Sequence, residues 1–439
     1  SRWSRSSLSS GADGAAAPPS AEPEEVTTRY VLDLDNLYML VTKELSEHVA
    51  TRRPPGAAGS LRPPLPSLAQ LGVQLHAEPL EMLRVRYRDL GPALPHLGVP
   101  LGPQGAAAAA DLLERRQREG QQLLRRSYAP ELQTFARLGV PPGLRQAIWA
   151  GCLPSAGAGV SVGTVGAHGG SADELQEVIH GVGLWEWLTD DVLRLDVAEH
   201  CANDMSYFPF DEIVEAMVLT LSRDAGVPRD CEAGPPQVPI LAGSEAEASL
   251  AALGEDAPPP SYVPPCGVVP FCGFSRYACP FAFLADKLET AYPLFRAFYC
   301  RHLSRLHTIS CQPATLLPLC ALFEALVSAA APHVCMHLGE LGPEAAPLRV
   351  ALPWIACGFV GYLRAEQVLQ LWDRVVGFGS VELVAVLAAA IFVFRERLLL
   401  SARGARDVEL VFSDLTALQA MPLLQGFLFA GDLTSPCEA

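Results

Sequence analysis

The chain has 439 residues, half of them hydrophobic, which is enough to build a large buried core. Its 48 acidic and 32 basic residues give a formal net charge of -16, which opposes binding to nucleic acid and to anionic lipid surfaces. The 12 cysteines include no CxxC pair, so neither a zinc ribbon nor a dithiol redox motif is expected. Reduced thiols in the cytoplasm are the simplest interpretation.

The N-terminal part reads as a tail followed by a helical region. Residues 1–25 are rich in Ser, Ala, Gly and Pro without an apolar period, so we expect them to be disordered. A helix-like stretch at 29–49 is followed by a Pro-rich linker at 52–70 and a charged helix at 110–138. The pattern predicts a separate N-terminal helical module over 26–130.

The remainder of the chain has helical periodicity almost throughout. In residues 365–378 the apolar positions recur at the 3.6-residue period, and residues 316–330 and 383–400 also predict core helices. Alternating strand patterns are scarce, so the predicted fold class is all-α. The longest apolar run, Leu383–Phe394, is shorter than the about 20 residues that a bilayer requires. We expect a buried helix there and no direct membrane insertion.

Residues 226–265 interrupt this helical pattern. They combine many prolines with six carboxylates and one arginine, a composition typical of an acidic low-complexity insertion.

Conventional catalytic motifs are scarce. His333 and His337 stand at helical i, i+4 spacing with Cys335 between them, but no further ligands accompany them, so no metal is expected. His302 and His307 are interpreted as packing or polar-rim residues. The sequence contains neither a GxxxxGK[ST] loop nor a GxSxG elbow, so a nucleotide hydrolase or serine hydrolase has no visible machinery.

The stretch "VVPFCGFSRY" raises the question of a reactive thiol. Cys272 lies directly before Gly273, two residues after Pro270. A nucleophilic cysteine needs an activating base, which the sequence does not identify. We therefore interpret the stretch as a backbone turn with a packed thiol.

Three phrases in a fixed order carry a family resemblance. "GVPPGLRQAIWAG" (139–151), "LTDDVLRLD" (188–196) and "LPWIACGFVGYLRAEQVLQLWDRVVGFGSVELVAVLAAAIF" (352–392) together resemble the TBC-domain family of Rab GTPase-activating proteins, over about residues 137–430. The resemblance is firmest in the last phrase, at Trp354, Phe359, Leu371, Trp372, Asp373 and Gly379. "RLHTIS", "ALFEAL" and "MPLLQGFLFA" are similar to the member-nineteen branch of that family.

The resemblance implies an all-α TBC-type helical domain over 137–430, interrupted by the insertion at about 226–265. It also implies an activity in trans on a GTP-loaded Rab, without turnover of a substrate by the chain itself. In the family an arginine from an IxxDxxR motif neutralises charge on the phosphoryl oxygens, and a glutamine from a YxQ motif positions the attacking water. No cofactor is expected, because GTP and Mg²⁺ belong to the partner GTPase.

The resemblance carries over to this chain only in part. Asp191 and Arg194 follow Leu188 at the IxxDxxR spacing, so Arg194 is the candidate arginine finger and Asp191 would orient it. An exposed ion pair of little energetic value is the alternative. Pro270 and Cys272 occupy the tyrosine and glutamine positions of YxQ, and a thiol is a weak hydrogen-bonding group. Cys272 is therefore expected to be inactive there.

Three functions remain open at this point. The first is a Rab GTPase-activating protein with weakened or atypical catalysis. The second is a catalytically inactive TBC-fold protein that binds a Rab or acts as a scaffold in membrane trafficking, and the third is a helical scaffold unrelated to GTPases. The expected location is cytoplasmic, with peripheral recruitment to endomembranes through the Rab. No short motif identifies the Rab or sets the oligomeric state.

Overall fold

A computed structural model describes a large part of the chain. The described residues are 34–51, 75, 77–99, 105–153, 176, 178–180, 182, 188–231, 264–268 and 270–429. The predicted disordered tail, the Pro-rich linker and residues 232–263 of the predicted insertion lie outside them.

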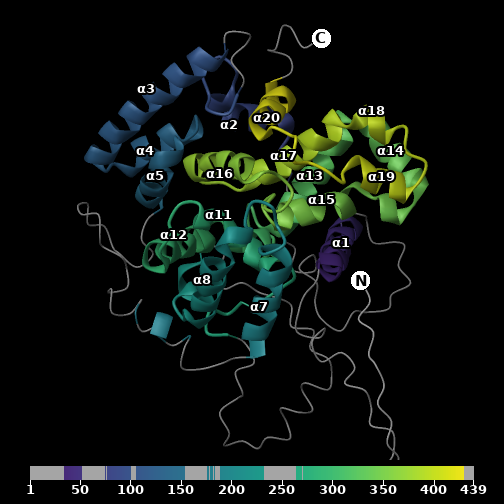
Figure 1. Ribbon diagram of the computed structural model, residues 1–439. Helices are drawn as coiled ribbons and strands as arrows, with labels where there is room; N and C mark the ends of the chain where they lie inside the picture. The colour runs from purple at the N-terminus through teal and green to yellow at the C-terminus, as the bar shows by residue number, and fades with distance from the viewer. Residues whose placement is uncertain are drawn as a thin grey trace, which may run out of the picture.

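Regular structure in the described part is helical, apart from isolated bridge residues: Val360 pairs with Leu363, and Phe271 also takes part in a bridge. The all-α prediction is confirmed there (Figure 1). The α-helices are α1 Leu34–Thr51, α2 Leu80–Arg86, α3 Gly105–Arg126, α4 Ala129–Arg137, α5 Arg145–Cys152, α7 Leu188–His200, α8 Asp211–Arg223, α9 Val227–Asp230, α11 Cys279–Ala282, α12 Leu288–Arg301, α13 Leu316–Ala330, α14 Pro332–Leu341, α15 Pro347–Ala356, α16 Ala365–Phe378, α17 Glu382–Phe394, α18 Glu396–Leu399, α19 Ala405–Val411 and α20 Ala420–Phe429.

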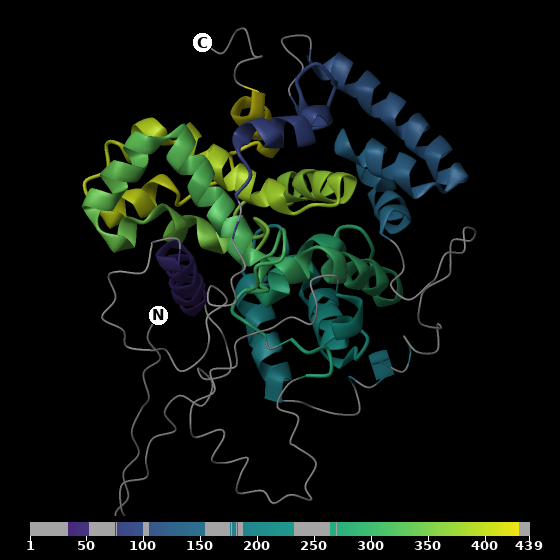
Figure 2. The same ribbon diagram turned by 180° about the vertical axis from the view of Figure 1, so that it is seen from behind.

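Helix α16 lies at the centre of the arrangement. In Figures 1 and 2 it runs between the group α3 to α5 on one side and α11 and α12 on the other. Helices α13, α15 and α17 pack together beside it, and α7 pairs with α8, both of which lie below α16 in Figure 1. Almost all of α16 is buried, including Leu371 and Trp372, as its apolar periodicity predicts.

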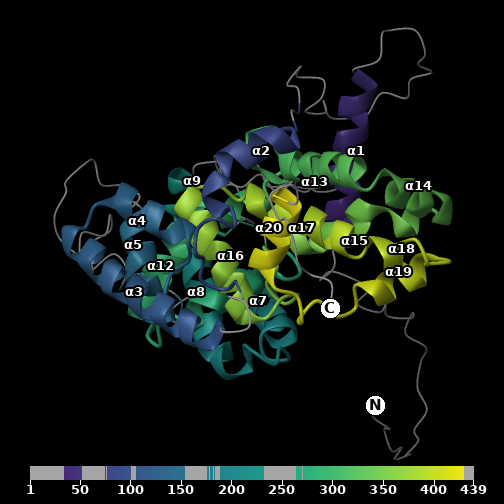
Figure 3. The same cartoon turned by 90° about the horizontal axis from the view of Figure 1, so that it is seen from above.

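The N-terminal helices are part of this core and do not form a separate module. Helix α1 packs against α13 and α15 (Figure 3), and α4 packs along α16. Leu37, Leu83 and Leu132, from α1, α2 and α4, belong to the same buried cluster as the C-terminal helices. The contact between α4 and α16 is close because Gly377 carries no side chain: a Cβ there would lie 2.6 Å from the backbone nitrogen of Arg137.

Two predicted helices are each broken into two. The charged helix expected over 110–138 divides into α3 and α4 at Ser127, whose φ of +52° is incompatible with an α-helix. Pro130 then stands in the first turn of α4, where proline is tolerated. The apolar helix expected over 383–400 is interrupted at Arg395, between α17 and α18. By contrast, α13 and α16 have the bounds that their periodicity predicts.

The start of the predicted insertion is folded. Val227 begins the short helix α9 and is buried. Arg296 on α12 donates to Asp230 at 2.7 Å and to Asp224 at 2.5 Å. Because these contacts tie 224–230 to α12, residues up to 231 belong to the helical body, which the composition of 226–265 alone does not indicate.

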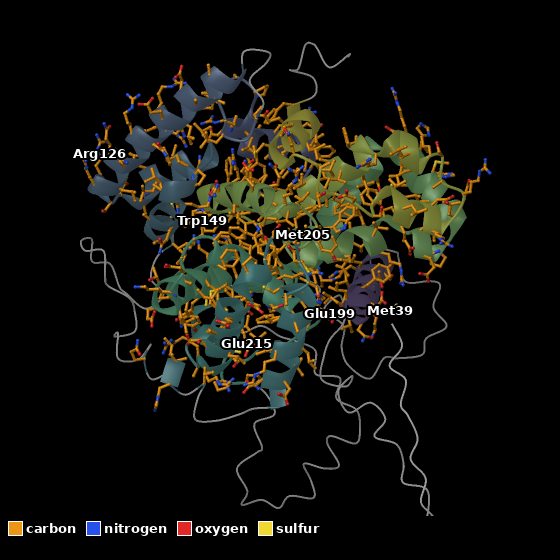
Figure 4. All side chains as sticks on the ribbon, viewed as in Figure 1. Met39, Arg126, Trp149, Glu199, Met205 and Glu215 are labelled. Carbon is orange, nitrogen blue, oxygen red and sulfur yellow. The ribbon has the colours of Figure 1, made fainter. Side chains whose placement is uncertain are left out.

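A buried carboxylate joins two of the phrases that carry the family resemblance. Asp373 on α16, fully buried, accepts hydrogen bonds from Arg145 at 2.9 and 3.0 Å and from the indole nitrogen of Trp149 at 2.9 Å. It also accepts the backbone N–H of Val140 at 3.1 Å. Both carboxylate oxygens are therefore used to hold 140–149 against α16; Trp149 is labelled in Figure 4.

Within the described residues no single helix is long and apolar enough to cross a membrane, and one bent pair, α13 with α14 at 109°, passes that test on length and composition only.

Candidate functional site

Helix α7 and the turn that contains Cys272 are held together by Asp196. Its buried carboxylate accepts the backbone N–H groups of Gly273 at 2.6 Å and Ser275 at 2.7 Å. The Ser275 hydroxyl donates to the Asp196 carbonyl at 3.2 Å. Gly273 has a φ of +91°, a conformation that glycine adopts without steric cost. The predicted backbone turn is confirmed, and its shape depends on a carboxylate from α7.

The thiol of Cys272 contacts His200, which lies on α7 like Asp196. His200 Nε2 lies 3.3 Å from Cys272 Sγ and 3.5 Å from Asp196 Oδ1. On the other side of the ring, His200 Nδ1 lies 3.4 Å from a guanidinium nitrogen of Arg276. The same guanidinium faces Cys357 Sγ at 3.8 Å and lies over the Tyr362 ring.

Electrostatics argue against a reactive thiolate at Cys272. Burial and the nearby carboxylates of Asp196 and Glu199 raise the pKa of Cys272 to about 11, against the smaller opposite effect of Arg276. Burial and then the charge of Arg276 lower the pKa of His200. At neutral pH a neutral thiol therefore faces a neutral imidazole. His200 therefore lies where a general base for the Cys272 thiol would be expected, but it does not convert the thiol to a thiolate.

This electrostatic environment predicts slow alkylation of Cys272. A pKa about two units above that of an ordinary cysteine leaves a thiolate fraction about 100-fold smaller below pH 9. Iodoacetamide in the presence of EDTA should therefore modify Cys272 about 100-fold more slowly than free cysteine at pH 8, with a rate that rises until the pH approaches 11. The measurement is peptide mass spectrometry over time, with half-exposed Cys335 as a reference for accessibility. Faster alkylation than free cysteine at pH 7 would indicate an activated nucleophile.

The candidate finger Arg194 lies on another face of α7. Its guanidinium contacts Asp191 at 3.3 Å, as the i, i+3 spacing predicts, and Glu215 on α8 at 3.4 Å. Asp191 is 76% exposed, so the pair also fits the alternative of a surface ion pair. Residues two apart on a helix do not face the same way, and Asp196 is the one that meets the Cys272 turn. The assignment of Arg194 as a finger stays a prediction.

A second match to the IxxDxx spacing lies five residues further along α7. Leu193, which is buried, and Asp196 stand at the first and fourth positions, and Glu199 stands where the motif has arginine. Glu199 is exposed and close enough to raise the pKa of Cys272. Figure 4 shows Glu199 on α7 and Glu215 on the neighbouring α8. In this register the aspartate of the spacing is the one that holds the Cys272 turn, and a glutamate stands at the last position.

The sequence-based prediction did not include Asp196, Glu199 or His200. The recurring spacing and the i, i+4 pair of Asp196 and His200 were the available signals, but the partners lie 72 to 79 residues further along the chain. In the described part of the chain, Asp196, His200 and Cys272 form the one group of three donor side chains close enough together to hold a metal ion.

The other histidines have structural surroundings. His307 Nε2 contacts the Tyr299 hydroxyl at 2.9 Å inside the core, and His302 is also buried, beside Phe298. Both match the packing interpretation. His337 Nε2 contacts the carbonyl of Ala402 at 2.9 Å.

Comparison with known proteins identifies the family. Residues 271–399 match the Rab-GTPase-TBC domain model. TBC1 domain family member 19 of Homo sapiens is 32% identical over 377 residues, which cover 83% of this chain. Residues 271–399 are therefore part of a TBC domain. It spans 65% of the length of that human relative. The predicted resemblance to the TBC family is thereby confirmed, and the relative is a member nineteen, as the looser phrases indicated.

A crystal structure of the Chlamydomonas flagellar RabGAP TBC domain aligns with a TM-score of 0.46 at 16% identity, covering 78% of this chain and 100% of that domain.

Proposed function

We propose that this TBC domain binds a Rab-family GTPase in its GTP-loaded form and stimulates GTP hydrolysis weakly or not at all. The proposal assigns Glu199 and Cys272 to the two finger positions, and it is supported by the hydrogen bonds of Asp196 to the turn that carries Cys272. An exposed carboxylate, Glu199, repels phosphate oxygens where an arginine would neutralise them. The protonated thiol of Cys272 is a poor substitute for a carboxamide in holding a water molecule.

Exposed apolar residues around this site support a binding role. Leu195 on α7 is 66% exposed, and Met205 and Phe208 in the segment after α7 are 91% and 56% exposed; Met205 is labelled in Figure 4. A partner surface that covers them would gain the free energy of apolar burial. The GTPase would bring its own GTP and Mg²⁺, so no cofactor of this chain enters the proposal. Recruitment from the cytoplasm to endomembranes would follow from the Rab.

A second candidate function is a Rab GTPase-activating protein that acts through Arg194. The contact between Arg194 and Asp191, with the Arg194 side chain 37% exposed, favours it because a finger must be both oriented and accessible. It requires the partner to approach a face of α7 different from the one that holds the Cys272 turn.

Arg194→Ala tests the two candidates against each other. Because the first proposal gives Arg194 no catalytic role, we expect wild type and variant to give the same low rate of single-turnover GTP hydrolysis across a panel of purified Rabs. Arg118→Ala is the matched control, since this arginine also makes an exposed ion pair on a helix, with Glu114. Binding to GTP-locked Rabs should persist in all three proteins. Stimulation by the wild type that disappears only in Arg194→Ala would establish the second candidate instead.

A further inference from the structure

Three side chains that could bind a metal ion converge between α7 and the Cys272 turn. Asp196 and His200 stand four residues apart on α7, so they lie on the same face of the helix. Cys272 approaches from the turn, and the nearest donor atoms of the three side chains all lie within 4.8 Å of one another. Nothing in the proposed interaction with a GTPase requires this combination of carboxylate, imidazole and thiol.

The two distances from His200 to the other donor atoms are close to those around a tetrahedral zinc ion. With bonds of about 2.0 to 2.3 Å, such an ion places nitrogen and sulfur ligands about 3.6 Å apart, and nitrogen and oxygen ligands about 3.3 Å apart. The corresponding distances here are 3.3 Å from His200 Nε2 to Cys272 Sγ and 3.5 Å from His200 Nε2 to Asp196 Oδ1. Small side-chain movements would complete the geometry.

The surroundings already orient the carboxylate. Each oxygen of Asp196 accepts one backbone N–H, from Gly273 or Ser275, and each keeps a further lone pair. Such supporting hydrogen bonds fix a ligand in place before an ion arrives. Asp196 would therefore lose little conformational entropy when an ion binds, because the fold already fixes its carboxylate.

We propose that Asp196, His200 and Cys272 bind a zinc ion, with water in the fourth position. On binding, the zinc–sulfur bond replaces the S–H bond of Cys272 and the thiol proton passes to solvent, so no oxidant or reductant is needed. The ion links α7 directly to the Cys272 turn. It also removes the thiol of Cys272 from contact with any water held by a partner GTPase.

Arg276 lies beside the proposed site and should weaken its affinity for zinc. Its guanidinium lies 3.4 Å from His200 Nδ1, but a histidine that binds zinc through Nε2 carries a proton on Nδ1 and needs an acceptor there. The guanidinium also repels the cation, whereas the carboxylate of Glu199 attracts it. Replacing Arg276 by an uncharged side chain of similar length should therefore strengthen binding.

Zinc titration of the full chain tests the site. The probe is Zn²⁺ alone, added to EDTA-stripped, dialysed protein in a phosphine reductant and followed by competition with a chromophoric chelator. We expect one Zn²⁺ per chain, at least tenfold weaker binding in Cys272→Ser and in His200→Gln, and about tenfold tighter binding in Arg276→Met. Cys311→Ser is the matched control, because Cys311 also contacts a histidine, His48, at 3.4 Å; it should bind like wild type.

Cobalt gives a second readout that reports the ligand directly. Co²⁺ in place of zinc should produce a thiolate-to-cobalt charge-transfer band in wild type and in Cys311→Ser, and no such band in Cys272→Ser. Circular dichroism checks that each variant is folded. If His200→Gln does not fold, the cobalt spectra of wild type and Cys272→Ser still test the site. Zinc binding that is absent, that is unchanged in Cys272→Ser, or that is lost in His337→Ala would overturn the proposal.

Discussion

Replacing Glu199 by arginine and Cys272 by glutamine together should convert this TBC domain into an activator of GTP hydrolysis. If Asp196 is the aspartate of the finger motif, the first substitution places a guanidinium at the arginine position, and the second restores a carboxamide that can hold the attacking water. An arginine finger in trans increases the rate ~10³ to 10⁵-fold, and we expect the low end, about 10³-fold, because the neighbouring side chains are not adapted to the new groups. The measurement is single-turnover hydrolysis across a panel of GTP-loaded Rabs.

Control variants distinguish the effect of the position of the new arginine from the effect of its positive charge. Asp191→Arg with Cys272→Gln adds the same charge to α7 at another exposed acidic position, and it should give no comparable gain. Glu199→Arg alone should give a partial gain, since the water would then depend on the GTPase's own glutamine. A double variant that still binds GTP-locked Rab but stimulates no more than wild type would refute the assignment of Glu199 to the finger position.

This prediction depends on a contact that the sequence alone could not provide. Leu188, Asp191 and Arg194 satisfy the spacing of the motif, and so do Leu193 and Asp196 with glutamate at the last position. Spacing along one helix cannot distinguish the two sets, because each forms a valid i, i+3 series. The distinction comes from Asp196 accepting hydrogen bonds from Gly273 and Ser275, a contact across 77 and 79 positions.

The helices were more predictable than the site. Helix α16 follows from apolar residues at the 3.6-residue period, and its bounds agree with the pattern because the whole face is buried against neighbours. The break between α3 and α4 was not visible, since charged residues continue across Ser127 and only its backbone dihedral marks the end of the helix. Likewise the metal-binding cluster unites residues of two distant segments, and no local pattern describes it.

The buried ion pair of Asp373 and Arg145 should be the most sensitive point of the fold. Asp373→Asn keeps the size of the side chain and an acceptor for Trp149, but it leaves the guanidinium of Arg145 charged with only 5% of its side chain exposed. Removing one partner of a buried pair costs about 3 to 5 kcal/mol of unfolding free energy. Chemical denaturation monitored by tryptophan fluorescence should show this loss, whereas Glu340→Gln on the exposed side of α14 should change stability by less than about 0.5 kcal/mol.

A double variant distinguishes the unpaired charge from lost packing. In Arg145→Met with Asp373→Asn the uncompensated guanidinium of Arg145 is gone. The buried guanidinium groups of Arg116 and Arg374 lose the Asp373 charge in both variants. The comparison therefore isolates Arg145, and a buried pair replaced by uncharged side chains of similar volume often costs little. The double variant should therefore be more stable than Asp373→Asn alone, although it has lost more of the native contacts. If instead the two losses add, the role of Asp373 lies in its hydrogen bonds to Trp149 and Val140 rather than in compensating the charge of Arg145.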